Sequence, residues 1–174
     1  LVIVPANGHR FIAEQMAPHL KDGQIIVLNP GRTFGALEVF QIFREKEVKA
    51  DVIVAEAQTF IFASRSINPA QVRIFRIKNS VPVAAIPAFR TTEVIKALRV
   101  AFPQFVPEAN IFLTSLNNIG AVFHPAITIL NASRIESTHG DFEFYIEGVT
   151  PAIDSILEKV DEERCKVTEA LGIR

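Results

Sequence analysis

The sequence predicts an α/β fold that is followed by an all-α region. In its first part, short apolar runs alternate with stretches whose apolar residues recur at helical spacing, which is the order of elements in a parallel sheet. From about residue 115 onward, the apolar residues keep helical spacing alone. We therefore place a boundary near residue 112, so that residues 1–112 form the α/β part and residues 113–174 the helical part.

Three apolar runs predict neighbouring parallel strands that are buried on both faces. They lie at residues 1–4, 24–28 and 51–55 and are rich in β-branched side chains. Apolar residues at helical spacing predict a helix after each of the first two runs, at residues 11–20 and 34–46. The order strand, helix, strand, helix, strand is typical of a parallel sheet with right-handed crossovers.

The next segment changes its period. Residues 60–77 form short, partly alternating runs, which predict antiparallel strands that end near Ala88. Thr91 and Thr92 are candidate caps of a helix, and Thr150-Pro151 predicts the start of the last helix, with proline at its first position. The pattern as a whole corresponds to the second half of a Rossmann-like sheet with an antiparallel extension, and then helices.

Composition excludes several classes of protein. Apolar residues make up 49% of the 174 residues, which excludes a disordered chain. The formal net charge of −1 offers no electrostatic footprint for nucleic acid or an anionic membrane, and no apolar stretch is long enough to span a bilayer. A single cysteine, Cys165, excludes an internal disulfide framework and a thiolate zinc site, so we expect no metal and a reducing cytoplasm.

The first residue is a leucine inside an apolar run, and no methionine or signal-peptide pattern precedes it. We therefore expect the chain to be a piece of a larger fold.

Four histidines are candidates for chemistry. His9 follows a predicted strand at the edge where open α/β sheets bind ligands, although a polar residue that opens a helix is the simpler interpretation. His19 and His139 have polar neighbours and are predicted to lie on the surface. His124 follows polar amides and an apolar stretch, so by pattern alone a core histidine and a catalytic histidine are both open.

Glu56 is the carboxylate of most interest, because it follows a buried run at the carboxyl end of a strand. A solvated charge at the strand end is the alternative. No Gly-x-Gly-x-x-Gly motif is present, so the pattern alone does not identify dinucleotide binding.

Three stretches stand out in their order and spacing. They are Val27-Leu28-Asn29-Pro30-Gly31-Arg32, then Ala55-Glu56 followed by Ala63-Ser64-Arg65, and then residues 114–125, which contain Asn117 and His124. Together they resemble the octopine/nopaline (opine) dehydrogenase family along nearly the whole chain. The resemblance implies an NAD(P)-dependent oxidoreductase acting on a CH–NH group. Such an enzyme joins the amine of an amino acid to a 2-oxo acid such as pyruvate, and it also runs the reverse oxidation.

The resemblance also assigns roles to residues. His124 takes the position of the catalytic histidine, and imidazole is suited to proton transfer near neutral pH. The substrate-binding positions fall on Glu56, Ala63 and Asn118. The positions that face the NAD or NADP cofactor fall on six residues at strand ends, which are Pro5, Ala6, Asn7, Asn29, Pro30 and Gly31.

The family's glycine-rich first turn would precede Leu1, and the aspartate that partners the catalytic histidine would follow Arg174. This piece alone is therefore expected to be inactive.

Two other functions remain open at this stage. A two-domain dehydrogenase acting on a hydroxy acid or glycerol phosphate is a near alternative, although the histidine at 124 speaks against it, since similar enzymes use a lysine. A non-catalytic nucleotide-binding or interaction protein that kept the fold is the alternative from another class. The sequence predicts small-molecule substrates, with no nucleic acid or membrane as a partner, and it leaves the oligomeric state open.

Overall fold

A computed structural model describes residues 1–173. By their internal contacts, these residues fall into two compact units, the first formed by Leu1–Asn117 and the second beginning at Asn118. The first unit contains both sheets, and the second is built of helices. The predicted fold class, an α/β part followed by an all-α part, is confirmed.

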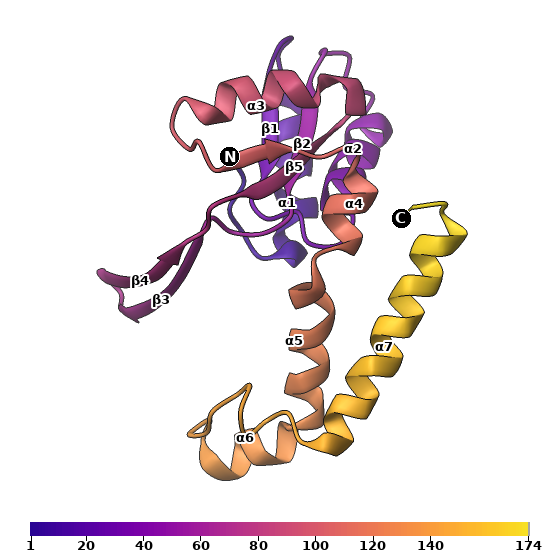
Figure 1. Ribbon diagram of the computed structural model, residues 1–174. Helices are drawn as coiled ribbons and strands as arrows, with labels where there is room; N and C mark the ends of the chain where they lie inside the picture. The colour runs from indigo at the N-terminus through magenta and orange to yellow at the C-terminus, as the bar shows by residue number, and fades with distance from the viewer. Residues whose placement is uncertain (174) are drawn as a thin grey trace. The chain divides into compact units, whose positions relative to one another are not determined.

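The main sheet of the first unit has four strands in the order β1-β2-β5-β6. Strand β1 (Ile25–Leu28) runs parallel to β2 (Ile53–Ala57), as predicted. Strand β5 (Val81–Ile86) pairs antiparallel with β2, and β6 (Phe105–Pro107) pairs parallel with β5 (Figure 1). Strand β6 was not expected from the sequence, since it is only three residues long and contains a proline.

The first predicted strand, residues 1–4, is shorter than expected. Only Val2 forms a bridge, which is parallel to Leu28 of β1. Its N–H donates to the carbonyl of Val27, and its own carbonyl accepts from Asn29 N. Pro5 has no N–H to continue the ladder, and a 3-10 turn (Ala6–Gly8) begins directly after it. The parallel direction predicted for this run is confirmed, but its length is wrong.

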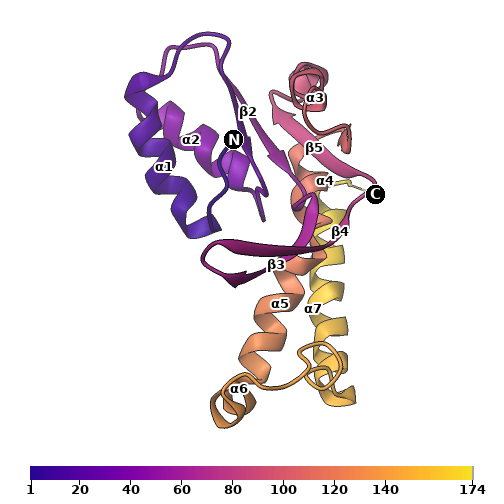
Figure 2. The same cartoon turned by 90° about the vertical axis from the view of Figure 1, so that its left-hand side faces the viewer.

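Helices cover both faces of the main sheet (Figure 2). Helices α1 (His9–Met16) and α2 (Gly35–Glu45) pack on the face that carries Leu28 and Val54. Helix α3 (Thr91–Arg99) packs on the face that carries Ile53 and Ala55. Because side chains alternate along a strand, each strand contributes to both cores, which explains the continuous apolar runs in the sequence.

The capping role expected of Thr91 is wrong. Thr91 is the first residue of α3, and Arg90 occupies the N-cap position without a side-chain cap. The Thr91 hydroxyl instead donates to the carbonyl of Ala88 and accepts from the N–H of Ala85. It therefore ties the start of α3 to β5. The short 3-10 turn Ala88–Arg90 leads from the strand into the helix.

The predicted antiparallel extension is confirmed as a separate hairpin and as the antiparallel strand β5. Strands β3 (Phe62–Asn68) and β4 (Gln71–Ile77) form a two-stranded sheet in which every residue is exposed (Figure 1). Its base is held by an edge-to-face contact between Phe62 and Phe102, with ring centroids 6.5 Å apart.

Helix α4 (Ile111–Leu116) belongs to the first unit. The sequence analysis placed the boundary near residue 112, whereas the compact unit extends to Asn117. Helix α4 is held to the first unit by apolar and polar contacts, since Ile111 packs in the core with Leu28 and Val54, and Thr114 and Ser115 are hydrogen-bonded to Glu56 of β2.

The second unit consists of α5 (Ile119–Leu130), α6 (Ala132–Thr138) and α7 (Pro151–Ala170). As predicted, the described residues after 112 contain no strand. Thr150 is the N-cap of α7, where its hydroxyl accepts from Ile153 N, and Pro151 is the first helical residue, as predicted. Each described helix of the chain is too short or too polar to cross a lipid bilayer.

Candidate cofactor edge and catalytic histidine

The carboxyl ends of three parallel segments meet at one edge of the main sheet. Pro5, Ala6 and Asn7 follow the Val2 bridge, and residues 29–31 follow β1. Strand β2, the parallel neighbour of β1, ends in Glu56 and Ala57 at the same edge. In open α/β sheets this is the edge at which ligands bind. The structure thus brings the six residues predicted to face the cofactor to one side of the first unit.

Asn29 provides an unsatisfied polar atom at this edge. Its side-chain oxygen is buried and has no hydrogen-bond partner among the described residues. A buried acceptor of this kind calls for a donor from outside the chain. Hydroxyl and carboxamide groups, such as those of a nicotinamide nucleotide, are donors of the required type. The edge therefore fits the cofactor in its chemistry.

Gly31 is the one position of this loop at which the structure requires a glycine. A Cβ atom at this position would overlap the Glu56 side chain. The absence of a side chain lets the loop lie directly against β2, and the Gly31 N–H donates to the carbonyl of Ala57 at 3.0 Å. Gly31 therefore positions the loop, and its N–H is already hydrogen-bonded within the chain.

Glu56 is fully buried, with an exposed fraction of 0%. One carboxylate oxygen accepts from the hydroxyls of Ser115 at 2.6 Å and Thr114 at 2.7 Å. The other accepts from Ala36 N, in the first turn of α2, at 2.9 Å. The alternative of a solvated charge at the strand end is thus wrong. Both oxygens are bonded within the chain, and the substrate-binding role of Glu56 stays a prediction.

Burial raises the pKa of the Glu56 carboxyl above its ordinary value, although its three hydrogen bonds act in the opposite direction. The same carboxyl links β2, α2 and α4. We call Glu56, Thr114, Ser115 and the Ala36 N–H the carboxylate hub. Sequence reasoning missed Thr114 and Ser115, because a hydroxyl on a short helix gives no sign of a partner more than fifty residues away.

His9 opens α1, as the simpler interpretation of the sequence predicted, but it is not a surface residue. Only 1% of it is exposed, and its Nε2 atom has no partner among the described residues. It lies so close to Gly35 that a Cβ there would come within 2.9 Å of its Nδ1. Burial lowers the pKa of His9, while nearby Glu38 acts in the opposite direction. The imidazole is therefore a neutral packing group between α1 and α2.

Ala63 lies on β3 of the hairpin, where it is exposed and pairs with Arg76 of β4. The structure thus separates Ala63 from the buried core that contains Glu56. Asn118, the other residue predicted to bind substrate, belongs to the second unit, where it occupies the N-cap position of α5 and is 7% exposed. The neighbouring Asn117 ends α4, and its carbonyl accepts from Gln58 Nε2 at 2.8 Å.

His124 lies within α5 and is exposed, so the alternative of a core histidine is wrong. Its Nε2 atom shares a hydrogen bond with the hydroxyl of Tyr145 at 2.5 Å. The ring also lies 6.4 Å from Phe144, centroid to centroid. Gly120 precedes it by one helical turn, and a Cβ at that glycine would come within 3.2 Å of the imidazole. The imidazole is oriented by neighbours but keeps access to solvent.

Among the described residues, no carboxylate lies within ion-pair distance of His124. Its partner is instead Tyr145, which sequence reasoning missed. Tyr145 is the single tyrosine of the chain, and it ends the aromatic stretch Phe142-Glu143-Phe144-Tyr145, which was the available signal.

The segment that carries Tyr145 is held in place by polar contacts. Arg134 of α6 forms an ion pair with Glu147 at 2.5 Å and stacks over Phe142 at 5.1 Å. The Asn131 side chain donates to the carbonyl of Gly148 at 2.8 Å. These contacts fix both ends of the stretch, so Tyr145 is presented to His124 from an ordered turn.

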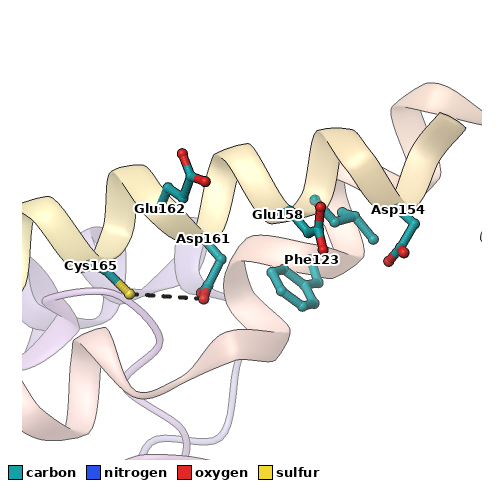
Figure 3. Close-up of a pocket in the computed structure, with 7 residues that line it drawn as sticks. Phe123, Asp154, Glu158, Asp161, Glu162 and Cys165 are labelled. Carbon is teal, nitrogen blue, oxygen red and sulfur yellow. Dashed lines mark hydrogen bonds between the residues drawn. The ribbon is translucent and has the colours of Figure 1, made fainter. Parts of the chain in front are cut away.

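The remaining candidates do not form a site. His19 and His139 are exposed, as predicted. A hollow of about 520 Å³ between α5 and α7 is lined by carboxylates and apolar groups, with Cys165 at one end (Figure 3). In that hollow the Asp161 carboxylate accepts from Arg164 at 2.7 Å, which lowers the pKa of Asp161. In the part of the chain that the structure describes, no group of His, Cys, Asp and Glu is arranged to hold a metal ion.

Comparison with known proteins assigns the helical part first. Residues 107–174 match the family described as NAD/NADP octopine/nopaline dehydrogenase, alpha-helical domain. The chain is 40% identical over 173 residues to an opine dehydrogenase of Arthrobacter sp. (strain 1C), and the match covers 99% of this chain and 48% of that protein. It is also 29% identical over 175 aligned positions to "Protein ocs" of Agrobacterium tumefaciens (strain Ach5), with 98% and 46% covered. The chain spans about half the length of the curated relatives it matches.

Solved structures agree with the fold. Octopine dehydrogenase with NADH and L-arginine superposes with a TM-score of 0.71 at 24% identity, covering 97% of this chain and 43% of that one. Apo yersinopine dehydrogenase gives a TM-score of 0.77 at 18% identity, with 99% and 44% covered.

The architecture is therefore that of the dehydrogenases in which a Rossmann-like sheet is followed by helices. Residues 107–174 match the octopine/nopaline dehydrogenase α-helical domain family, and the resemblance of the whole chain to the opine dehydrogenases is confirmed.

Proposed function

We propose that the natural-length protein is an opine dehydrogenase that uses NADH or NADPH to condense an amino acid with a 2-oxo acid such as pyruvate, and that catalyses the reverse oxidation. The proposal rests on one observation above all. Within the segment that matches the family's helical domain, an exposed imidazole is held through Nε2 by a tyrosine hydroxyl and has no carboxylate partner in the described chain. This arrangement supports a role for His124 in exchanging a proton with a bound substrate.

The reaction joins two substrates and removes one water. The amine nitrogen attacks the carbonyl carbon, the carbonyl oxygen leaves as water, and the resulting C=N bond accepts a hydride at carbon and a proton at nitrogen. Bound nicotinamide nucleotide supplies the hydride. We assign to His124 the proton transfers at the carbonyl oxygen and at the nitrogen, since imidazole is the side chain best suited to give and take protons near neutral pH.

The cofactor is assigned to the carboxyl edge of the first sheet. Asn29, with its unsatisfied oxygen, is the proposed hydrogen-bonding residue, and Pro5, Ala6 and Asn7 form the neighbouring loop. Pro30 and Gly31 are proposed to line this edge without donating a hydrogen bond, since proline has no N–H and the Gly31 N–H is bonded to the Ala57 carbonyl. The loops between parallel strands and helices are the usual place for a dinucleotide. We place the protein in the cytoplasm, which fits its single free cysteine.

The test is a screen of the natural-length protein with pyruvate, a panel of amino acids and both reduced cofactors. Turnover is measured as the loss of the reduced cofactor's absorbance at 340 nm. Consumption of NADH or NADPH that requires both an amino acid and a 2-oxo acid is the expected result. Reduction of the 2-oxo acid alone would favour a hydroxy-acid dehydrogenase. Cofactor binding without turnover of any pair would favour the non-catalytic alternative.

A further inference from the structure

The β3–β4 hairpin lies in a segment of unusual charge. Residues 57–92 contain no aspartate or glutamate, although the whole chain has a net charge of −1. Of the cations in this segment, Arg90 forms ion pairs with Asp51 and Glu93, and Lys78 donates to Thr59. The other three are Arg65, Arg73 and Arg76, all on the hairpin. Among the described residues, no carboxylate lies within ion-pair distance of these three.

Strand pairing places the three arginines on one face of the hairpin. Arg65 pairs directly with Arg73, and Arg76 pairs with Ala63, which is two residues from Arg65 on β3. Arg73 and Arg76 are three residues apart and would lie on opposite faces of a regular strand. The register shift opposite Ala63 and Ser64 adds Phe75 as an extra residue, which returns Arg76 to the face of Arg73. We call Ala63, Arg65, Arg73, Phe75 and Arg76 the arginine face.

The two faces of the hairpin have different surroundings. The opposite face carries Phe62, whose ring contacts Phe102 in the body of the first unit. On the arginine face, the Arg73 guanidinium lies over the Phe75 ring, 5.8 Å from its centroid. Stacking of this kind fixes the direction of the side chain and leaves the N–H groups free to donate. The arginine face is therefore exposed and partly ordered.

Two like charges directly opposite each other destabilise a strand pair unless an anion neutralises them. A guanidinium group presents a planar fork of N–H donors that matches a carboxylate in a bidentate manner. Ala63, the cross-strand partner of Arg76, has only a methyl group and leaves the guanidinium uncovered on that side of the pair. The face thus has the charge and the donors to bind a small molecule with one or two carboxylates.

We propose that the arginine face binds the carboxylate groups of the substrates, and both carboxylates of the condensed product. This inference rests on the proposed function, in which an amino acid and a 2-oxo acid each bring one carboxylate. It assigns a substrate class to a surface that carries Ala63, the residue placed in the substrate pocket by the sequence resemblance. Arg76, the cross-strand partner of Ala63, is the residue expected to contribute most.

The experiment compares Arg76→Gln and Arg65→Gln with the control Arg44→Gln, an exposed arginine on α2, in the natural-length protein. Loss of a charge-assisted hydrogen bond corresponds to about tenfold to a hundredfold in affinity. We expect the KM of the amino acid or the 2-oxo acid to rise by about this factor in the first two variants, while kcat changes little. Arg44→Gln leaves both constants unchanged.

A second measurement connects the effect to the carboxylate. The amide of the preferred amino acid lacks the negative charge, so in the wild type it binds more weakly than the acid. In the variant that has lost the relevant arginine, the acid and the amide bind equally. If the acid keeps its full advantage in all three hairpin variants, Arg65→Gln, Arg73→Gln and Arg76→Gln, the arginine face does not bind carboxylates.

The two proposals fail in different ways. If no substrate pair is turned over by the wild type, the proposed function fails. Calorimetry with an N-(1-carboxyethyl) amino acid, on the wild type and on the triple arginine variant, then tests the face directly, and equal heats overturn this inference. If turnover is normal and the hairpin variants match Arg44→Gln, this inference alone is overturned. Binding of a single-stranded RNA that the triple variant loses, with unchanged KM values, also overturns it.

Discussion

Glu56 and His124 are titratable side chains in opposite environments. Their comparison distinguishes a residue that stabilises the fold from one that is available for chemistry. Glu56, in the first unit, is 0% exposed and receives three hydrogen bonds from its own chain. His124, in the second unit, is exposed, and among the described residues its imidazole is hydrogen-bonded to Tyr145 alone. A buried carboxyl group with both oxygens hydrogen-bonded stabilises a fold, whereas an oriented imidazole with solvent access is available for proton transfer. We therefore expect variants of Glu56 to lose stability and variants of His124 to lose turnover.

The largest effect on stability is expected for Glu56→Ala. This change leaves the Ala36 N–H and the hydroxyls of Thr114 and Ser115 without their acceptor in a buried site. The free energy of unfolding should fall by about 2–4 kcal/mol. Urea denaturation measures it, with Glu45→Ala on the exposed end of α2 as the control, which should change by less than about 0.5 kcal/mol. Equal losses of unfolding free energy in the two variants would show that the carboxylate hub does not stabilise the fold.

The hub also predicts the direction of a pH dependence. Because burial raises the pKa of Glu56 in the folded state, folding is coupled to proton uptake above the ordinary value of 4.5. The contribution of Glu56 to stability is then fully present below pH 4.5 and declines as the pH rises through the folded-state pKa. Glu56→Gln has no such titration, so the stability advantage of the wild type over this variant should shrink as the pH increases from 4. An advantage that grows with pH would contradict the raised pKa.

Gly31→Ala is expected to have a smaller but clear effect on the same hub. The added methyl group would overlap the Glu56 side chain, so either the loop or the carboxylate must move. Overpacking of this kind costs about 1–3 kcal/mol. Gly8→Ala is the matched control, since its new Cβ would meet only the Val4 side chain, no closer than 3.2 Å. Thermal unfolding of the two variants should therefore differ, and identical midpoints would show that the loop does not press on Glu56.

Tyr145→Phe should have the smallest effect on stability, since the lost hydroxyl is exposed and within reach of water. The free energy of unfolding should change by less than about 0.5 kcal/mol. Turnover should fall by about fivefold, which corresponds to about 1 kcal/mol of hydrogen bonding that no longer orients the imidazole. Stopped-flow kinetics on the natural-length protein measures this change. Unchanged turnover would show that the tyrosine has no part in positioning His124.

The sequence was sufficient for the elements whose signal is local. Apolar runs predicted the parallel pair β1 and β2, and Thr150-Pro151 predicted the start of α7, because burial and capping act within a few residues. The first strand was predicted too long. An apolar run shows which residues can form a strand, but it does not show how many of them pair with the neighbouring strand. Strand β6 was missed because three residues that include a proline carry no strand signal.

The candidate site shows the same division. The functional roles of His124 and the strand-end loops stay predictions; these residues were predicted because a resemblance and the parallel-sheet rule pointed to them. The partners were not: Thr114 and Ser115 reach Glu56 across 58 and 59 positions, and Tyr145 reaches His124 across 21. The pairing of Arg65 with Arg73 was also invisible, since it depends on the register of a hairpin that contains two irregularities. Contacts between distant positions require the folded chain.

In the proposed mechanism, His124 carries out the proton transfer. The most direct test is the turnover number of His124→Ala in the natural-length protein, with His19→Ala, another exposed histidine, as the control. Loss of a general acid–base group lowers the rate by about 10²- to 10⁴-fold. We predict a loss of this size in His124→Ala, with unchanged unfolding and cofactor affinity, and no loss in His19→Ala. Full turnover in a folded His124→Ala protein would contradict the account.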